Sequence, residues 1–482
     1  MRTPIEIATA VRKGELKAAE VLDECVAAIE AGNPPLNAFV HLDFDAARVV
    51  ADRVDAAVAA GDDPGPFAGV PLGVKDLEDC AGMPTSHGSL LFKGRPPVPS
   101  DSIHVARLRA AGAVPIGKTA APEFGTPAFT STRAWGTTRN PWNPIRTPGG
   151  SSGGSAAAVS GGLVPMATAS DGGGSTRIPA GFCGLVGHKP SYGRIPHPGN
   201  QPNQTAVYGL LVTTVADAAR HLDVTAGPDD RDRTSLPPPE LSYEAAIENV
   251  TVAGMRAAWS PDLGFAIVDP DVAGLAEAAA MDLVAAAGLT LVDKPVQLTD
   301  PLKVWWSGGV LDIWTTLERD MWPERADDLE YYNLIPARTS ATVTAPSIGR
   351  IWKQRARFEQ EVAAWFDDVD VLLTPTTAVT AYVAEGPMPS QIQGVEVSPA
   401  MNTPFTMLAN LCWNPAISVP AGVAPDGLPV GLQIVARRHR DEVALRLARI
   451  FEQARPWPRL APVAAPVASA LASPLASEGS HP

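Results

Sequence analysis

Two glycine-rich stretches each contain a serine in a setting where a hydroxyl could become reactive. Ser175 follows three consecutive glycines in the segment DGGGSTR (171–177), directly after the apolar run LVPMATAS (163–170). Glycines let successive backbone amides point at one spot, so such a turn can stabilise a developing oxyanion while it presents a serine hydroxyl. Ser151 lies in a second glycine–serine stretch, residues 149–155. The alternative is that the triple glycine forms only a turn.

A serine hydroxyl is inert at neutral pH unless a base lies beside it. The candidate base is Lys75, in the apolar segment GVPLGVKDL (69–77). A free lysine has a pKa of about 10.4 and is protonated, but enclosure in a low-dielectric site lowers that pKa and makes the neutral amine available. The apolar neighbours favour burial. The alternative is a surface lysine that pairs with Asp76 or Glu78.

A conventional serine triad is a weaker interpretation of the same residues. The segment GGSSG (149–153) matches the pattern GxSxG, which requires an apolar strand before it and a helix after it. The preceding residues, RNPWNPIRTP, contain three prolines and predict no strand. A Ser-His-Asp site also needs a histidine, and the surroundings of His188 and His197 are those of ordinary structural histidines.

A phosphate-binding loop is a second competing interpretation, because GAVPIGKT (112–119) matches the pattern GxxxxGK[ST]. Such a loop follows a strand, precedes a helix and leaves its amides free for phosphate. Here a helix is expected before Gly112, the residues AVPI indicate a buried strand, and Pro115 has no amide hydrogen to donate. We therefore interpret this match as coincidental.

The composition excludes several classes of protein. A net charge of -14 argues against nucleic acid or an anionic membrane as partner, since both favour a basic surface. The four cysteines are scattered without metal-ligand spacing and are expected to be buried thiols. No segment has the pattern of a signal peptide or a membrane span, so we expect a cytoplasmic protein.

The elements that would position these residues alternate between helices and strands. Helices are expected at about 3–13, 17–31 and 45–60, and apolar strands at 69–77, 163–170, 369–377, 415–422 and 428–436. This alternation predicts an α/β architecture with a largely buried sheet. We divide the chain into an N-terminal helical scaffold (1–65), a core (66–200), a variable helical and loop region contributing to a pocket (201–345), a C-terminal part of the same α/β domain (346–460) and a disordered tail (461–482).

Longer stretches of the sequence resemble the amidase signature family. The resemblance rests on residues 148–196 (PGGSSGGSAAAVSGGLVPMATASDGGGSTRIPAGFCGLVGHKPSYGRIP), on 69–89 (GVPLGVKDLEDCAGMPTSHGS), and on PAISVPAG followed by GLPVGLQIVA. It extends from the N-terminus to about residue 455. It implies a single large α/β domain, with a central mixed β-sheet covered by helices on both faces.

The resemblance also implies roles for individual residues. Lys75 would be the catalytic lysine, Ser151 the bridging serine after a cis Gly150–Ser151 peptide bond, and Ser175 the nucleophile of an acyl-enzyme. The further roles are an oxyanion hole formed by the amides of Gly172, Gly173, Gly174 and Ser175, and a loop braced by Asp171 and Arg177. No metal or organic cofactor is implied.

The resemblance indicates which bond is cleaved, an amide, more clearly than it indicates the substrate molecule. Family members in tRNA-dependent amidotransferases often have the residues RQPA after the nucleophile, whereas this chain has RIPA, with Ile178 in place of the amide. Isoleucine favours an apolar acyl or amine group, and Phe124, Thr126 and Ile178 are the candidate substrate-binding residues. An aromatic cluster at 305–332 either lines the same pocket or belongs to the ordinary core.

Three hypotheses follow. The first is a stand-alone amidase, monomeric or homodimeric, that acts on hydrophobic or aryl amides and whose range could extend to esters, carbamates (urethanes) or nylon-type oligomers. The second is the glutamine-hydrolysing subunit of a tRNA-dependent amidotransferase complex. The third, a catalytically silent binding protein, is disfavoured because Lys75, Ser151 and Ser175 are all present.

Overall fold

Apolar segments from most of the chain form one large mixed sheet in the computed structural model, which describes residues 1–198 and 203–462. The strands of this sheet are β1 Phe39–Leu42, β2 Pro71–Lys75, β3 Val114–Thr119, β6 Met166–Asp171, β7 Val186–Lys189, β8 Val207–Val212, β9 Arg256–Trp259, β10 Thr290–Leu291, β11 Val371–Pro375, β14 Ala416–Val423 and β15 Pro429–Ala436. Two small hairpins pair β4 Ser131–Thr132 with β5 Gly136–Thr137, and β12 Gln391–Ile392 with β13 Val395–Glu396.

The strand order places the candidate residues in neighbouring strands. In the part of the chain that the structure describes, the 11-stranded sheet has the order β1-β3-β2-β6-β8-β7-β14-β15-β11-β9-β10. Strand β2 lies between β3 and β6 and runs parallel to both. Because the carboxyl ends of parallel strands meet at one edge, Lys75 at the end of β2 lies near the loop that follows β6. The sheet thus brings residues about 100 positions apart into one site.

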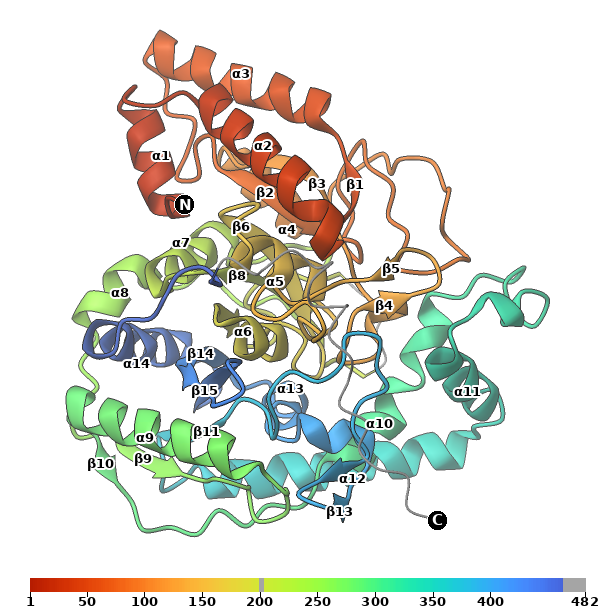
Figure 1. Ribbon diagram of the computed structural model, residues 1–482. Coiled ribbons are helices and arrows are strands. Elements are labelled where there is room, and N and C mark those ends of the chain that lie inside the picture. Colours follow the sequence, from red (N-terminus) through yellow and green to blue (C-terminus); the bar gives the residue numbers. More distant parts are fainter. Residues whose placement is uncertain (199–202, 463–482) are drawn as a thin grey trace.

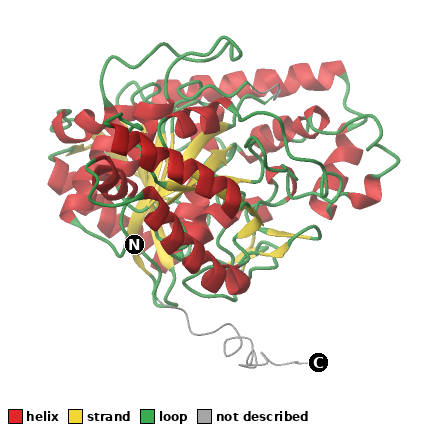
Figure 2. Cartoon of the chain, turned by 90° about the horizontal axis from the view of Figure 1, so that it is seen from above, coloured by secondary structure: helices red, strands yellow, loops and turns green. Residues whose placement is uncertain are grey.

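Helices surround the sheet on both faces, and Figure 2 shows the strands in the interior of the molecule with helices around them. The α-helices are α1 Pro4–Arg12, α2 Ala18–Leu36, α3 Phe44–Ala60, α4 Ile103–Ala110, α5 Gly153–Ser160, α6 Arg177–Cys183, α7 Val215–Thr225, α8 Tyr243–Asn249, α9 Pro270–Ala287, α10 Leu302–Gly309, α11 Tyr331–Ser340, α12 Ala345–Trp365, α13 Met407–Leu411 and α14 Asp441–Ala454. The 3₁₀ helices are η1 Glu123–Gly125, η2 Asp312–Thr315, η3 Ala326–Asp328 and η4 Pro399–Asn402.

The N-terminal helices follow the sequence predictions closely. Thr3 caps α1, with Pro4 at the first helical position and Glu6 completing a capping box. Gly61 ends α3 in a left-handed conformation, φ 83°. The second helix is longer than predicted, because α2 continues through two prolines to Leu36. Figure 1 shows α1, α2 and α3 together at one end of the molecule, beside β1, β2 and β3.

The interpretation of residues 113–117 as a strand rather than a loop is confirmed. Strand β3 spans Val114–Thr119, and every residue of that strand is buried. The ammonium group of Lys118 donates to the carbonyl oxygen of Glu78 at 2.6 Å and to Thr85 Oγ1 at 2.8 Å. Since both the backbone and this lysine are engaged inside the protein, the segment offers no phosphate-binding loop.

The prediction for residues 201–345 is wrong in part. This region contributes α10 and α11, which lie at one side of the molecule in Figure 1, but it also supplies the strands β8, β9 and β10 to the central sheet. Strand β8 pairs with both β6 and β7. The sequence of β8, VYGLLV, follows a polar segment, and pairing partners distant in the chain decide its conformation. The predicted tail falls almost entirely in residues 463–482, outside the described residues.

The four cysteines are free and buried, as predicted.

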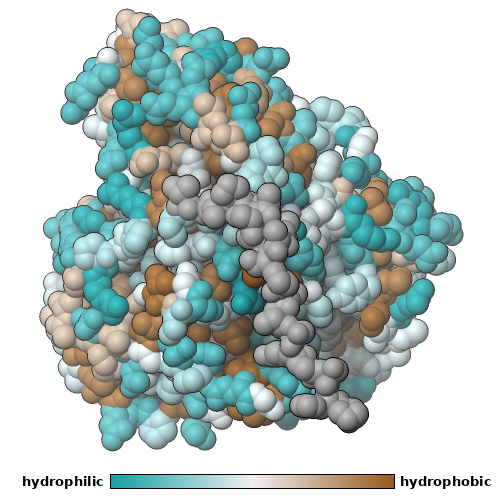
Figure 3. All heavy atoms as spheres, viewed as in Figure 1, coloured by the Kyte–Doolittle hydropathy of each residue, from teal (hydrophilic) through white to brown (hydrophobic). Residues whose placement is uncertain are grey.

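Among the described residues, no helix combines the length and apolar character needed to cross a bilayer. The face drawn in Figure 3 is largely hydrophilic with smaller apolar patches between.

Candidate active site

Lys75 lies at the end of β2 in the interior of the protein. Its neighbours Leu72 and Val74 are fully buried, and the lysine itself is only 1% exposed. The backbone amide of Lys75 donates to Thr168 Oγ1 in the adjacent strand β6 at 2.9 Å. The sequence predicts an apolar strand here, and the structure places Lys75 of that strand in the core beside β6.

Three serine hydroxyls surround the amine of Lys75. Lys75 Nζ lies 2.8 Å from Ser151 Oγ, 2.7 Å from Ser152 Oγ and 3.0 Å from Ser170 Oγ. A hydroxyl can accept a hydrogen bond from an ammonium or donate one to a neutral amine. The cluster can therefore accommodate Lys75 in either protonation state.

Burial lowers the pKa of Lys75 to about 7, although the negative charges of Asp171 and Glu78 oppose this shift. A lysine in water has a pKa of about 10.4 and almost no neutral form at pH 7. Here roughly half of the molecules would hold a neutral amine at that pH. The amine is consequently available as a base under physiological conditions.

Ser151 precedes helix α5 and follows a cis Gly150–Ser151 peptide bond, as predicted. A side chain at Gly150 would approach the carbonyl oxygen of Pro127 to 2.5 Å, so only glycine fits there. The amide of Ser152 donates to the carbonyl oxygen of Ser175 at 3.2 Å, which joins the two serine-bearing segments. Ser151 is 3% exposed, and both Ser151 and Ser175 line the same cavity.

Ser175 lies in a tight connection between β6 and α6. Gly174 has φ 129°, and a side chain there would approach Thr406 Oγ1 to 2.4 Å, so the turn requires glycine at this position. Gly172, Gly173 and Ser175 line the cavity. The chain therefore presents the Ser175 hydroxyl and neighbouring backbone to the same space.

The amide of Gly174 has a partner within the loop. It donates to Asp171 Oδ1 at 2.7 Å. An amide engaged by a carboxylate is not free to bind an oxyanion, so Gly174 acts in this geometry as a residue that shapes the turn. The amides of Gly172, Gly173 and Ser175 are the remaining candidates from the predicted set.

Asp171 and Arg177 form a fully buried ion pair beneath the loop. Arg177 Nη2 lies 2.9 Å from Asp171 Oδ1, and Nε lies 2.9 Å from Oδ2. Burial alone would raise the pKa of Asp171, but the Arg177 guanidinium holds that pKa well below its usual range. Asn410 Nδ2 also donates to Asp171 Oδ1 at 2.9 Å, and Gln433 Oε1 accepts from Arg177 Nη1 at 2.6 Å. This network satisfies the buried charges and fixes the base of the loop.

Trp305 and Thr406 contact the loop from the other side. Trp305 Nε1 donates to the carbonyl oxygen of Gly172 at 2.9 Å, and Thr406 Oγ1 donates to that of Gly173 at 2.5 Å. A side chain at Gly173 would approach the Trp305 ring to 2.4 Å. Two successive peptide groups of the glycine turn are therefore anchored by residues from distant parts of the chain.

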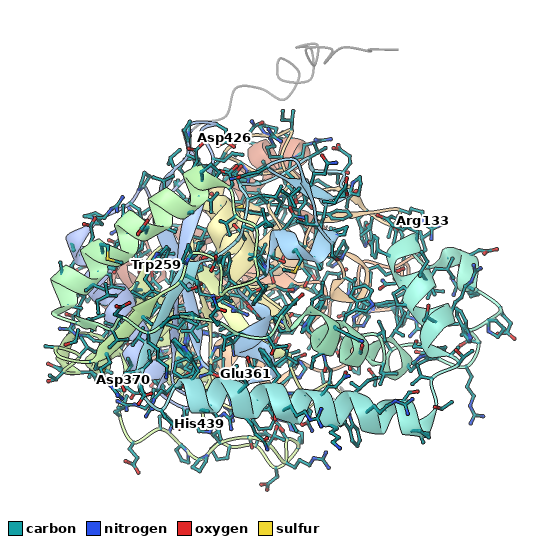
Figure 4. All side chains as sticks on the ribbon, turned by 90° about the horizontal axis from the view of Figure 1, so that it is seen from below. Arg133, Trp259, Glu361, Asp370, Asp426 and His439 are labelled. Carbon is teal, nitrogen blue, oxygen red and sulfur yellow. The ribbon has the colours of Figure 1, made fainter. Side chains whose placement is uncertain are left out.

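A mostly apolar cavity of about 310 Å³ opens in front of the two serines. Phe124, Thr126 and Ile178 line it, at the positions that the sequence analysis selected. The aromatic cluster divides into two groups. Trp305, Trp306 and Tyr332 line the cavity, whereas Trp314 and Trp322 pack in a separate apolar cluster with residues such as Leu91 and Met321. Arg133, labelled in Figure 4, donates to the carbonyl oxygen of Leu329, just before α11, at 2.7 Å.

The described residues lining the cavity include no histidine. His188 is buried in β7, 3.8 Å from Asp441, and the His197 ring packs on Tyr208 with centroids 4.3 Å apart. Within residues 1–198 and 203–462 no cluster of His, Cys, Asp and Glu has the arrangement of a metal site. The amine of Lys75 is instead the group that contacts the serine hydroxyls.

Sequence reasoning missed several residues of the site. Ser152 and Ser170 contact Lys75, and only the adjacency of Ser152 to Ser151 could have indicated one of them. Asn410 and Thr406 reach the glycine turn from segments more than 100 residues away. Trp305 belongs to the aromatic cluster that was a pocket candidate, but its hydrogen bond to the turn was not predicted. No local pattern marks such contacts.

Known proteins resemble this chain over most of its length. The sequence model of the Amidase family matches residues 20–445. An acylamidase from Rhodococcus erythropolis is 36% identical over 463 residues, which cover 94% of this chain and 95% of the acylamidase. A glutamyl-tRNA(Gln) amidotransferase subunit from Synechococcus sp. (strain RCC307) is 36% identical over 471 residues, which cover 92% of this chain and 96% of its own length.

Solved structures agree with the sequence relatives. A bacterial aryl acylamidase of the amidase signature enzymes superposes with a TM-score of 0.88 at 30% identity, covering 95% of this chain and 96% of its own. The 6-aminohexanoate cyclic dimer hydrolase, solved with its substrate, gives a TM-score of 0.85 at 31% identity, covering 95% and 97%. Both structures therefore match this chain over 95% of its length.

Proposed function

The chain belongs to the amidase signature family, and from this premise we propose that it is a stand-alone amidase that hydrolyses apolar or aryl amides through an acyl-enzyme on Ser175. The observation that carries the proposal is the position of a buried lysine, with its pKa lowered to about 7, at 2.8 Å from the Ser151 hydroxyl and in the same site as Ser175. The relatives include an acylamidase and an aryl acylamidase. The roles of the three residues in this chain are our proposal.

Acylation begins with proton transfer to the neutral amine of Lys75. Ser151 passes its proton to Lys75 Nζ while it accepts the proton of Ser175, and the Ser175 oxygen attacks the substrate carbonyl carbon. No hydrogen bond joins Ser151 Oγ and Ser175 Oγ in the described structure, and in the proposal this contact forms when substrate is bound. Catalytic hydrogen bonds commonly tighten only in the substrate complex.

The tetrahedral intermediate carries its negative charge on the former carbonyl oxygen. In the proposal this oxygen binds the amides of Gly172, Gly173 and Ser175, since that of Gly174 is engaged by Asp171. Ser151 then donates its proton to the departing nitrogen and regains one from Lys75, and the carbon–nitrogen bond breaks. Water attacks the acyl-enzyme by the same relay, which releases the carboxylic acid and restores Ser175.

The cavity supports an apolar substrate. Phe124, Ile178 and Trp305 are among its lining residues, and its volume of about 310 Å³ is within the range of small-molecule sites. Aromatic walls favour flat or hydrophobic groups on either side of the amide. Esters and carbamates of similar shape present the same carbonyl carbon to Ser175, so they belong to the proposed range.

A role within a tRNA-dependent amidotransferase complex is the second candidate, favoured by the 36% identity with the glutamyl-tRNA(Gln) amidotransferase chain from Synechococcus. Glutamine carries a carboxylate as well as an ammonium group, and a carboxylate in an enclosed site needs a cationic partner. The described residues that line the cavity include no lysine or arginine. Glutaminase activity that appears only with partner chains would favour this candidate over the stand-alone amidase.

The proposal is tested with a panel of aryl amides, aliphatic amides, esters, carbamates and glutamine, assayed with the wild type and with Ser175→Ala. We expect the wild type to hydrolyse aryl or alkyl amides and Ser175→Ala to lose the activity by at least about 10⁴-fold. Lys75→Ala should lose more activity on amides than on esters, because an amine leaving group needs the returned proton. Full activity of Ser175→Ala on the best substrate would contradict the mechanism.

A further inference from the structure

Among the described residues, one in the wall of the substrate cavity has a carboxyl group. Asp312, the first residue of η2, lines the cavity, and the other described lining residues are apolar side chains, glycines, or neutral polar groups such as Thr316 and Asn333. A carboxylate in an apolar wall weakens the binding of apolar groups beside it, unless a partner compensates its charge. The proposed mechanism makes no use of it.

Asp312 is only partly compensated by the protein. Its Oδ1 accepts a hydrogen bond from the backbone amide of Asn203 at 3.1 Å. Arg355, whose positive charge acts on this carboxyl, donates to Glu359 at 2.8 Å and to backbone carbonyl oxygens, including that of Leu411 at 3.0 Å. No cationic side chain among the described residues forms a salt bridge with Asp312.

Because no cation of the described residues forms a salt bridge with Asp312, the pKa of its carboxyl group is shifted. Burial raises the pKa of Asp312 to about 7, while the Asn203 amide and Arg355 oppose the rise. A cation placed against this carboxylate would reverse the shift and recover the free energy lost by burying it. A ligand with an ammonium group can supply that charge from within the cavity.

We propose that Asp312 is a specificity-determining residue that binds an ammonium group of the substrate, so that the preferred substrates are amides with an apolar or aryl body and a positively charged nitrogen away from the scissile bond. This inference rests on the proposed amidase function and names its substrate class. An anionic substrate of equal shape is rejected, because two carboxylates would face each other in a site of low dielectric constant.

The kinetic test uses two series of isosteric substrates. The acyl series contains the anilides of heptanoic acid (neutral), 6-aminohexanoic acid (cationic) and adipic acid (anionic). The amine series contains the acetamides of 4-ethylaniline, 4-(aminomethyl)aniline and 4-aminobenzoic acid. In at least one series we expect Asp312→Asn to lower kcat/KM for the cationic substrate by at least about tenfold, with the neutral substrate changed by less than about threefold.

The control variant is Asp320→Asn, which removes the same charge from an exposed carboxylate of the same segment that does not line the cavity. It should leave the ratio of cationic to neutral kcat/KM unchanged. The inference is overturned if Asp312→Asn leaves this ratio unchanged in both series. A loss equal to that of Asp320→Asn would also overturn it, because the effect would then be long-range.

A binding measurement separates this inference from the proposed function. Calorimetry with the inactive Ser175→Ala variant should give hexylammonium a Kd at least about tenfold lower than that of 1-heptanol, and this preference should vanish in Ser175→Ala/Asp312→Asn. Equal Kd values for the two ligands in Ser175→Ala overturn the inference even if amides are hydrolysed. A clear ammonium preference without any amide hydrolysis would instead overturn the proposed function.

Discussion

Trp305 holds the carbonyl oxygen of Gly172 through its indole nitrogen at 2.9 Å, and its ring occupies the space that a side chain at Gly173 would need. In a trans peptide the C=O and N–H bonds point in opposite directions. Fixing the carbonyl of Gly172 therefore also fixes the direction of the Gly173 amide. A residue from helix α10 thus orients one of the amides that the proposed oxyanion site uses.

Replacing Trp305 by phenylalanine removes the indole N–H while it keeps an aromatic ring. Removal of one oxyanion donor costs about 10²–10³ in kcat, and we expect the loss of orientation alone to cost about tenfold. The effect should appear in kcat with KM changed little. Trp306→Phe is the matched control, since Trp306 lines the same cavity and is 44% exposed. An unchanged kcat in Trp305→Phe, or an equal loss in both variants, would contradict this role.

The pKa of Lys75 predicts the pH dependence of amide hydrolysis. The reactive form is the neutral amine, and burial lowers the pKa of this lysine to about 7. For wild type, kcat/KM should therefore fall about tenfold per pH unit below pH 7 and level off above it. Steady-state assays from pH 5 to 9.5 with a neutral amide measure this profile. A profile that stays flat through pH 5–6 would exclude Lys75 as the titrating base.

Ser152 tunes this base through its hydroxyl, 2.7 Å from Lys75 Nζ. A hydroxyl that accepts a hydrogen bond from the ammonium stabilises the charged form, so its removal should lower the pKa of Lys75 further. We expect the acid limb of kcat/KM in Ser152→Ala to move to lower pH, with a plateau reduced by about tenfold or less. Ser160→Ala serves as control: Ser160 is the last residue of helix α5, of which Ser152 is the N-cap, and its hydroxyl donates to the Cys183 carbonyl oxygen. A shift of the Ser152→Ala limb to higher pH would contradict the assignment.

The buried pair of Asp171 and Arg177 makes a large contribution to stability that depends on both partners. Arg177→Met leaves the Asp171 carboxylate without its cation, and we expect the free energy of unfolding at pH 7 to fall by about 3–5 kcal/mol. Since the pKa of Asp171 is held low, this contribution is present above about pH 4 and is lost as the pH falls through that lowered value. Urea unfolding at pH 7 and pH 5 measures this contribution, which should be equal at the two pH values because both lie above that range.

Arg95→Met is the control for that experiment. Arg95 pairs with Glu318 at 2.8 Å, but their side chains are 39% and 52% exposed. The loss of such a surface pair should cost less than about 1 kcal/mol. If both variants lost the same free energy of unfolding, the buried Asp171–Arg177 pair would contribute no more to stability than a surface pair.

The sequence predicts the parts of the site that depend on local chemistry. The glycine turn before Ser175, the apolar strand around Lys75 and the strand at 114–119 follow from residue types over short windows, and the structure forms all three. Rejecting the GxSxG match is also supported, because no strand precedes Ser151 in the described residues from 138 to 150. Local sterics and burial determine these features, so they can be predicted from short segments of the sequence.

The contacts that complete the site could not be predicted in the same way. Asn410 and Gln433 join the Asp171–Arg177 pair from strands and helices more than 200 residues further along the chain. Asp312 reaches the cavity from a segment with no strong periodicity, and β8 enters the sheet from a region predicted as helix and loop. Such positions depend on tertiary packing, which no short window of a single sequence records.

The most direct test of the account is to find which side chain reacts. The wild type is treated with a fluorophosphonate probe until amide hydrolysis stops, and the labelled residue is located by peptide mapping with mass spectrometry. We predict one label per chain, on Ser175, at a rate that increases with pH through about 7 as Lys75 loses its proton. Complete inactivation with the label on Ser151 or Ser152, or undiminished amide hydrolysis by protein fully labelled at Ser175, would contradict it.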